Sequence, residues 1–244
     1  MSALGLFEVP WSDYAPSLWD GLVKTLEFTV GGFAGAALLG LVLALMRLSP
    51  LRALRLPAAI YTELFKNVPL LAIIFLTYFG LVSVGVKLCV FQAGALSLIV
   101  FYASYLSEIF RSAIAGVHDG QQEAAEALGL SRRVTFAHVV FPQALRQALP
   151  GTNTMLVDLL KSTSLLVTIS AAELMSQGQL IASETFRALE VYAVIAVLYF
   201  VVCYPFSQGL LWFERQVRAG VPLLPRRRRR MRLVRAMLEE EVVA

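Results

Sequence analysis

Four long apolar runs dominate the pattern of hydrophobic and polar positions along the chain. None contains Asp, Glu, Lys or Arg, and each is close to the roughly 20 residues that a helix needs to cross about 30 Å of hydrocarbon: 28–46, 68–86, 88–107 and 191–213. A weaker run, 151–172, contains Asp158 and Lys161 and is the fourth of five in chain order. The runs are continuous rather than alternating in polarity, which favours helices over membrane strands. The pattern therefore predicts an all-α integral membrane protein with five transmembrane helices.

The amino-acid composition excludes an ordinary soluble domain. Of the 244 residues, 58% are hydrophobic and 16% are charged, and the mean hydropathy is +0.70. Soluble domains carry about 25% charged residues. The two cysteines, Cys89 and Cys203, both fall inside apolar runs and are too few for a disulfide framework or a zinc site.

Positive charges gather after the first, third and fifth runs, and this orients the predicted helices. Loops on the cytoplasmic side of a membrane are enriched in Lys and Arg. Before the C-terminal tail, the cations on this side are Arg47, Arg52, Arg55, Arg111, Arg132, Arg133, Arg146, Arg215 and Arg218. The opposite side is sparse in cations, with Lys24, Lys87 and Arg187. The asymmetry predicts an N-terminus outside and a cytoplasmic C-terminus for this multi-pass protein.

One membrane domain is predicted over 18–221, between an extracytoplasmic leader, 1–17, and a basic cytoplasmic tail, 222–244. The first helix is expected after Asp20 and Gly21. Glycines in that helix, at Gly31, Gly32, Gly35 and Gly40, are expected to allow close helix packing.

A short basic loop, 47–56, is expected to follow the first helix and to close at Pro57. The next segment, 58–67, has the spacing of an amphipathic helix. Pro69 then opens the second span, because the first turn of a helix does not need the N–H that proline lacks.

The tail contains five consecutive arginines, Arg226, Arg227, Arg228, Arg229 and Arg230. Such a run can bind nucleic acid or anionic lipid. No aromatic side chain is interleaved with it, and a cluster beside a membrane helix attracts anionic lipid at about 1 kcal/mol per basic residue. Membrane lipid is therefore the expected partner of the tail, and nucleic acid is not.

The predicted cytoplasmic segment 120–142 is too structured for a simple connection. Residues 121–128 are strong helix formers, Gly129 is placed to end that helix, and Ser131 can cap a second short helix that Pro142 stops. An ordered helix–turn–helix facing the cytosol has two readings. It is a docking element for another protein, with small Ala124 and Ala125 allowing close approach, or an amphipathic helix lying on lipid.

The spacing within this segment resembles the EAA loop of the membrane subunits of ABC importers. That pattern is Glu-Ala-Ala, three residues, Gly, nine residues, then Ile-x-Leu-Pro. The chain has Glu123, Ala124, Ala125, Gly129 and Pro142 at those positions, with Val and Phe in place of Ile and Leu. The resemblance implies a cytoplasmic coupling helix between spans three and four that sits in a groove of a separate ATPase subunit.

The resemblance extends beyond the loop to the polar amino-acid branch of these permeases, over about 18–218. It rests on the stretches YTELFKNVPLL (61–71), YLSEIFRSAIAGV (105–117), FPQALRQALPGTNTMLVDLLKSTSLL (141–166) and VYAVIAVLYFVV (191–202). It implies transport by alternating access. It also implies three kinds of partner: two ATPase subunits, a second permease subunit that is identical or related, and an extracytoplasmic solute-binding protein that delivers an amino acid. The stretch SETFRALEVY (183–192) resembles acidic amino-acid systems, so an acidic substrate is weakly favoured.

Motifs of nucleotide binding and catalysis are missing from the sequence. It has no GxxxxGK[ST] phosphate loop, no HExxH and no GxSxG, and His118 and His138 stand alone. The chain is therefore not expected to be an enzyme or to bind a cofactor or metal, and the resemblance places ATP and Mg on the partner ATPase. The alternative function is a self-contained small channel or secondary transporter. An intramembrane enzyme would need a catalytic constellation that the sequence lacks.

Ionisable groups inside a span are costly and usually functional. Asp158 and Lys161 lie three residues apart on one predicted helix face, beside the hydroxyls of Ser162, Thr163 and Ser164. This face is a candidate lining of the substrate pathway, because an amino acid carries both an ammonium and a carboxylate. The alternative is a structural intrahelical pair, or a Lys161 side chain that reaches the interface. Asn153 is expected to bond backbone freed by Pro150.

Two further charged pairs lie where the second and third spans meet the cytosol. Glu63 and Lys66, and Glu108 and Arg111, are each three residues apart. They are interpreted mainly as helix-end ion pairs, with a gate as the alternative.

Overall fold

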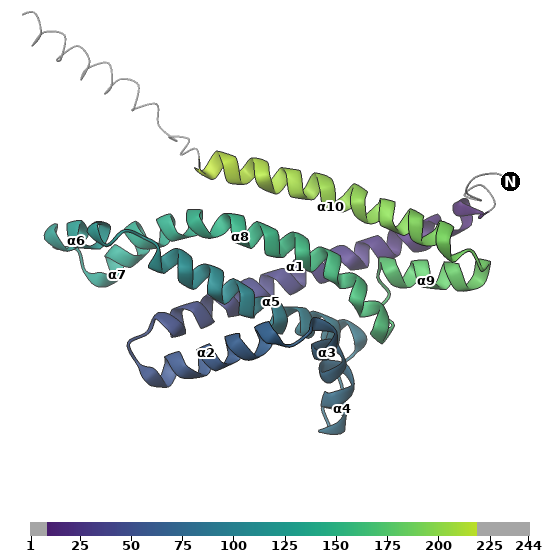
Figure 1. The fold of residues 1–244 in the computed structure, drawn as a ribbon, viewed down its shortest axis with the longest axis horizontal. Coiled ribbons are helices and arrows are strands. Elements are labelled where there is room, and N and C mark those ends of the chain that lie inside the picture. The colour runs from purple at the N-terminus through teal and green to yellow at the C-terminus, as the bar shows by residue number, and fades with distance from the viewer. Residues whose placement is uncertain (1–8, 219–244) are drawn as a thin grey trace, which may run out of the picture.

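The computed structural model describes residues 9–218, and every regular element in that range is helical. Figure 1 shows long helices running side by side, with shorter ones at the two ends and on one flank. The elements are α1 Trp11–Leu48, α2 Arg52–Asn67, α3 Leu70–Phe75, η1 Leu76–Gly80, α4 Leu81–Ser83, α5 Val90–Ala115, α6 Asp119–Ala127, α7 Arg132–Thr135, η2 Phe136–Val140, α8 Phe141–Ser162, η3 Thr163–Ile169, α9 Leu174–Thr185 and α10 Ala188–Arg218. The predicted arginine-rich tail, 222–244, lies outside the described residues.

Three helices, α1, α5 and α10, are each long and apolar enough to cross a bilayer. They contain the first, third and fifth predicted runs, so these three predictions are confirmed as single helices. The start of the first helix was predicted wrongly, since α1 begins at Trp11, within the proposed leader. The reason is tertiary packing. Trp11, Tyr14 and Leu18 lie against a buried cluster formed by α9 and α10, and these contacts extend the helix beyond its apolar run.

The second run, 68–86, does not form one straight helix. Its helical part is α3, the π-helical turn η1 and α4, which together rise only about 20 Å at 1.5 Å per residue. Val68 precedes a proline and is extended, because the proline ring disfavours helical backbone in the residue before it. The chain therefore bends by 108° between α2 and α3. Pro57, expected to close a loop, lies inside α2.

The weaker run, 151–172, which is fourth in chain order, is also only part of a longer bent element. Helical backbone continues from α7 through η2, α8 and the 3₁₀ segment η3 to Ile169, and α9 follows at 49°. Ser170 adopts the left-handed conformation, with a φ of 57°, at the end of η3. If each bent pair counts as one span, the described part of the chain has up to five spans.

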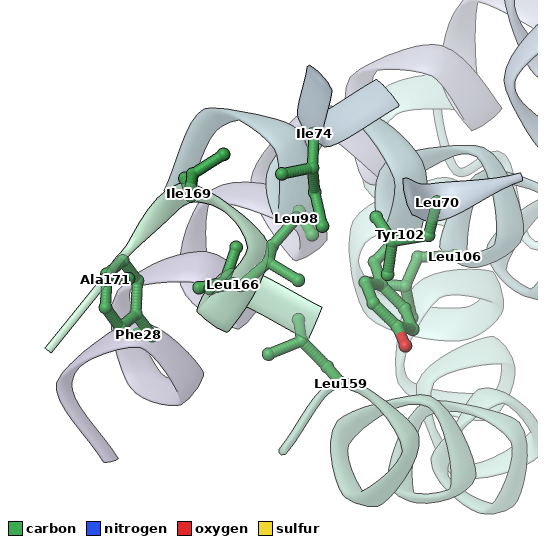
Figure 2. Packing of buried hydrophobic residues seen from close by; sticks show 11 residues of the cluster. Phe28, Leu70, Ile74, Leu98, Tyr102, Leu106, Leu159, Leu166, Ile169 and Ala171 are labelled. Carbon is green, nitrogen blue, oxygen red and sulfur yellow. The ribbon is translucent and has the colours of Figure 1, made fainter. Parts of the chain in front are cut away.

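The main core lies between α1, α3, α5, α8 and η3 (Figure 2). Its buried side chains come from segments far apart in sequence and are Phe28, Ala36, Leu70, Ile74, Leu98, Tyr102, Leu106, Leu159, Leu166, Ile169 and Ala171. A second buried cluster joins α5 to η2 and α8, and a third joins α9 to α10.

Close packing of α1 on α5 depends on glycines of α1, as the sequence predicts. A Cβ at Gly35 would lie 2.5 Å from the Ile99 side chain, and one at Gly40 would lie 2.9 Å from Leu106 Cβ. A Cβ at Gly31 would meet no atom within 4 Å, so this glycine has no part in the contact.

Candidate functional site

The segment with EAA-type spacing forms the predicted helix, glycine turn and helix. His118 precedes α6, and its Nδ1 accepts a hydrogen bond of 3.1 Å from the backbone N–H of Gly120. After α6, Gly129 has a φ of +73°, which a residue with a side chain adopts only at a cost. Ser131 occupies the N-cap position of α7, although its side chain makes no capping hydrogen bond.

The prediction that Pro142 stops the second helix was wrong. α7 passes through the π-helical η2 directly into α8, and Pro142 lies in the first turn of α8. The π-helical turn η2 directly before it shifts the hydrogen-bond register by one residue, so the helix continues past a residue that has no N–H to donate. As a result, α6 is connected to the membrane-embedded part of α8 by uninterrupted helix from Arg132 onward.

The residues of the EAA pattern present an outward face on α6. Ala125 is buried, with 4% of its surface exposed, while Glu123 and Ala124 are exposed and Leu128 is 80% exposed. The Nε2 of Gln143 on α8 donates a 3.3 Å hydrogen bond to Oε1 of Gln121 on α6. Figure 1 shows α6 and α7 at one extremity of the long axis, opposite the start of α1 and α9. The geometry thus gives an exposed small-residue surface attached to the end of a long helix.

Asp158 and Ser162 on α8 meet a tyrosine of α5 that the sequence interpretation did not identify. The hydroxyl of Tyr102 lies 2.8 Å from Asp158 Oδ2 and 2.8 Å from Ser162 Oγ. One hydroxyl proton can serve only one acceptor, so the chain of donation runs from Ser162 to Tyr102 and from Tyr102 to the carboxylate. The pairing spans 56 positions, so no periodicity within one helix could have indicated it.

A cavity of about 410 Å³ opens beside this cluster, between α8 and α10. Its lining includes Asn153, Asp158, Lys161, Ser207 and Glu214. No ion pair joins Asp158 to Lys161 within the described residues, so the predicted intrahelical neutralisation does not form. The cavity therefore has a carboxylate and an ammonium that are exposed and not joined to each other.

The hydroxyl-bearing residues that follow Lys161 do not all face this cavity. Thr163 is fully buried and donates to the carbonyl of Leu160, and Ser164 donates to the carbonyl of Lys161. Both bonds lie within the helical segment itself. Asn153 also differs from expectation, since its Nδ2 donates to the carbonyl of Leu210 on α10, at 3.4 Å, rather than to backbone freed by Pro150.

Both predicted helix-end pairs are present as ion pairs. Lys66 Nζ lies 2.9 Å from Glu63 Oε1 on the exposed surface of α2. Glu108 pairs with Arg111 and also with Arg47 of α1, whose NH1 lies 2.6 Å from Glu108 Oε2. Arg47 was missed as a partner because it belongs to a different helix.

Glu173, the residue directly before α9, is a buried acid. It is fully buried, and its carboxylate accepts hydrogen bonds from the backbone N–H groups of Met175 and Ser176 and from the hydroxyl of Tyr199. The sequence could have indicated a helix N-cap here, because an acidic residue directly precedes the helix-forming stretch LMSQGQL. It could not have indicated that Glu173 is buried, because the burial depends on the packing of α10.

The family of the chain follows from a comparison with family models. The model described as "Binding-protein-dependent transport system inner membrane component" matches residues 36–219, which is most of the chain. The chain belongs to this family. It is thus a permease subunit of an ABC importer and a multi-pass protein of the inner membrane, and the alternative of a self-contained channel or secondary transporter is set aside.

Curated relatives resemble this permease over most of their length. The permease is 33% identical over 198 residues to a probable glutamine ABC transporter permease protein, GlnM, of Bacillus subtilis, covering 81% of this chain and 92% of that protein. It is 33% identical over 205 residues to the glutamine transport system permease protein GlnP of Escherichia coli K12, covering 83% and 94%.

Solved structures agree with the described fold. The crystal structure of an amino acid ABC transporter with histidines contains a chain that is 35% identical, with a TM-score of 0.80, covering 84% of this permease and 96% of that chain. The inward-facing MetNI methionine ABC transporter matches at a TM-score of 0.68 with 22% identity, which supports the fold alone.

Proposed function

We propose that the permease moves a polar amino acid across the cytoplasmic membrane by alternating access, in a complex with separate ATPase subunits. Its similarity to glutamine permeases over more than four-fifths of its length carries this proposal. ATP and Mg bind to the ATPase subunits, and a solute-binding protein delivers the substrate from outside. A second permease subunit, identical or related, completes the pathway, because five helices form only part of its wall.

The proposed topology has five spans, with each bent pair crossing the membrane once. Arginine-rich ends support this orientation. The α1–α2 turn and α6–α7 lie at the same end of the molecule in Figure 1, and both carry the cations that favour the cytoplasmic side. The N-terminus is accordingly outside and the C-terminus inside.

Coupling to ATP hydrolysis is assigned to α6. Its exposed Glu123 and Ala124, and the left-handed turn at Gly129, provide a small protruding surface that fits a groove on an ATPase subunit. The unbroken helix from Arg132 to Ile169 then transmits a displacement of α6 toward the cavity beside Asp158. This connection supports a lever rather than a helix that only rests on lipid.

The substrate pathway is assigned to the cavity between α8 and α10. Asp158 is fixed by Tyr102 and offers a partner for the substrate ammonium, while Lys161 offers one for the carboxylate. Of the other hydroxyls predicted to line the pathway, Ser162 supports Asp158 through Tyr102. Thr163 is buried away from it.

The assembled transporter tests the coupling assignment. Ala124→Asp should release the ATPase during co-purification, because a charge at this exposed position would be buried unpaired in the interface. Ala188→Asp adds the same charge at the exposed start of α10, where a helix N-terminus tolerates it, and should leave the complex intact. Reconstituted permease without ATPase should catalyse no uptake. Vectorial flux from the permease alone, or full ATPase retention by Ala124→Asp, would contradict the proposal.

A further inference from the structure

We propose that a cavity between the end of α1, the start of α2 and α5 binds the phosphate headgroup of an anionic phospholipid. The cavity has a volume of about 400 Å³ and is lined by Arg47, Arg52, Arg55, Leu56, Ala59 and Arg111. Four of its six lining residues carry a guanidinium group. The exposed wall of the cavity is mostly apolar, and arginine forms bidentate hydrogen bonds with phosphate oxygens, so the wall and the four arginines together suit a ligand that carries both a phosphate and an alkyl chain.

The positive charge of the cavity is only partly compensated by the protein. Glu108 is the acid that pairs with lining residues, and it is shared between Arg47 and Arg111. Arg52 and Arg55 are exposed and make no ion pair with any described residue. Nε of Arg111 is buried and has no hydrogen-bond partner within the described chain. The site therefore has an excess of positive charge, which an anion would compensate.

The start of α2 strengthens this excess. Its first turn contains no acidic residue, and no side chain caps its N-terminus. A helix N-terminus carries a partial positive charge from its unpaired N–H groups. Arg52 and Arg55 lie in this same turn, so the helix and its side chains attract an anion to one place.

The apolar surroundings favour a lipid over a free phosphate ion. Arg47 follows the apolar stretch of α1 directly and Arg111 lies near the end of α5, so both are at the boundary between apolar and polar surface. Leu56, which lines the cavity, is 63% exposed, and Ile60, one turn further along α2, is 58% exposed. A ligand with a phosphate and an adjoining alkyl chain would contact both the arginines and this exposed apolar strip. Basic pockets between membrane helices bind such headgroups.

Binding of a lipid here would fix α2 against α1 and α5. The headgroup would bridge the first turn of α2 to the Arg47–Glu108–Arg111 network, joining three helices at one point. It would thereby hold the start of α2, at the opposite end of that helix from its 108° bend with α3.

The test uses the assembled transporter in nanodiscs that contain phosphatidylglycerol and phosphatidylcholine, with the lipid retained by the complex measured by native mass spectrometry. Arg52→Gln with Arg55→Gln removes two uncompensated charges and keeps the Arg47–Glu108–Arg111 network. We expect phosphatidylglycerol retention to fall roughly tenfold or more, given about 1 kcal/mol for each basic residue near an anionic surface. Phosphatidylcholine retention should not change.

The matched control removes two other exposed arginines of the same predicted side, Arg146→Gln with Arg215→Gln, and should retain phosphatidylglycerol as the wild type does. An equal fall in both double variants would overturn the proposal, because any surface charge would then suffice. Displacement of the lipid by millimolar inorganic phosphate would also overturn it in favour of a soluble-anion site. Loss of the ATPase from Arg52→Gln/Arg55→Gln with lipid retention unchanged would overturn it in favour of a protein interface.

Discussion

At the scale of single residues, Glu173 shows how a buried charge is stabilised by the backbone around it. Its carboxylate satisfies two N–H groups of the first turn of α9, and Thr25 of α1 accepts the N–H of Leu174 through its hydroxyl. Leaving a buried donor without a partner costs about 1–3 kcal/mol. Glu173 is therefore a structural residue that joins α9 to α10, and the adjacent Leu174–Thr25 hydrogen bond joins α9 to α1.

Glu173→Ala should lower the free energy of unfolding by roughly 3 kcal/mol or more, because several buried donors lose their acceptor together. Glu173→Gln keeps a carbonyl acceptor and the side-chain shape, so its loss should be clearly smaller. Thermal unfolding of the detergent-solubilised complex, followed by size-exclusion fluorescence, measures both. Equal losses for the two variants would show that the hydrogen bonds are not the reason.

A second prediction at this scale concerns amino-acid uptake and the contact between Asp158 and Tyr102. Asp158→Asn removes the charge but keeps the shape, and should reduce amino-acid uptake roughly tenfold or more, since a hydrogen bond to a charged group contributes about 1.5–3 kcal/mol. Tyr102→Phe should reduce it less, because it only frees the carboxylate. Uptake is measured in proteoliposomes that contain the whole transporter.

Asp20→Asn serves as the control for these variants, because it removes an exposed carboxylate of α1 outside the cavity lining. It should leave uptake and ATPase co-purification unchanged. Wild-type uptake by Asp158→Asn would assign Asp158 a purely structural role.

At the scale of elements, the sequence predicted helices correctly where hydropathy alone determines them. Uninterrupted apolar runs predicted the middle of α1, α5 and α10, because burial in lipid needs no information from neighbouring helices. Pro69 was predicted to open the second span, and the break between α2 and α3 does lie at Val68–Pro69. The 108° angle at this break was not predictable, because hydropathy carries no information about the direction of the chain. The contacts of Tyr102 with Asp158 and of Arg47 with Glu108 depend on how α5 packs against α8 and α1.

The α1–α5 interface gives an element-scale prediction about close packing. Gly40→Ala would place a Cβ 2.9 Å from Leu106 Cβ and 3.2 Å from the Ala103 carbonyl oxygen, so the helices would have to separate. Overpacking of this kind costs about 1–3 kcal/mol, seen as a lower midpoint of thermal unfolding. Gly31→Ala is the matched control on the same helix. It meets no atom within 4 Å and should be neutral or stabilising, because alanine favours a helix over glycine.

At the scale of the whole molecule, one permease subunit leaves a large apolar surface uncovered. Phe200 and Trp212 of α10 are 63% and 64% exposed, and Leu38 of α1 is 68% exposed. The cavity proposed for the substrate lies between α8 and α10, with Asp158 and Lys161 both exposed. Lipid and a second permease subunit are the two environments that can cover such surfaces. The proposed orientation determines which end of each helix faces the cytosol and which end faces the outside.

Labelling of cysteines from one side of the membrane measures that orientation. Cys89, before α5, is exposed and lies in the turn assigned to the outside, whereas Cys203 is buried within α10. A membrane-impermeant maleimide added to intact cells should therefore label the permease, and Cys89→Ser should abolish the labelling while Cys203→Ser should not. Ala127→Cys, in a Cys89→Ser background, places a thiol on the exposed surface of α6 and should react only after the membrane is permeabilised. Labelling of Ala127→Cys from outside, with Cys89 protected until permeabilisation, would reverse the topology and place α6 out of reach of any cytoplasmic ATPase.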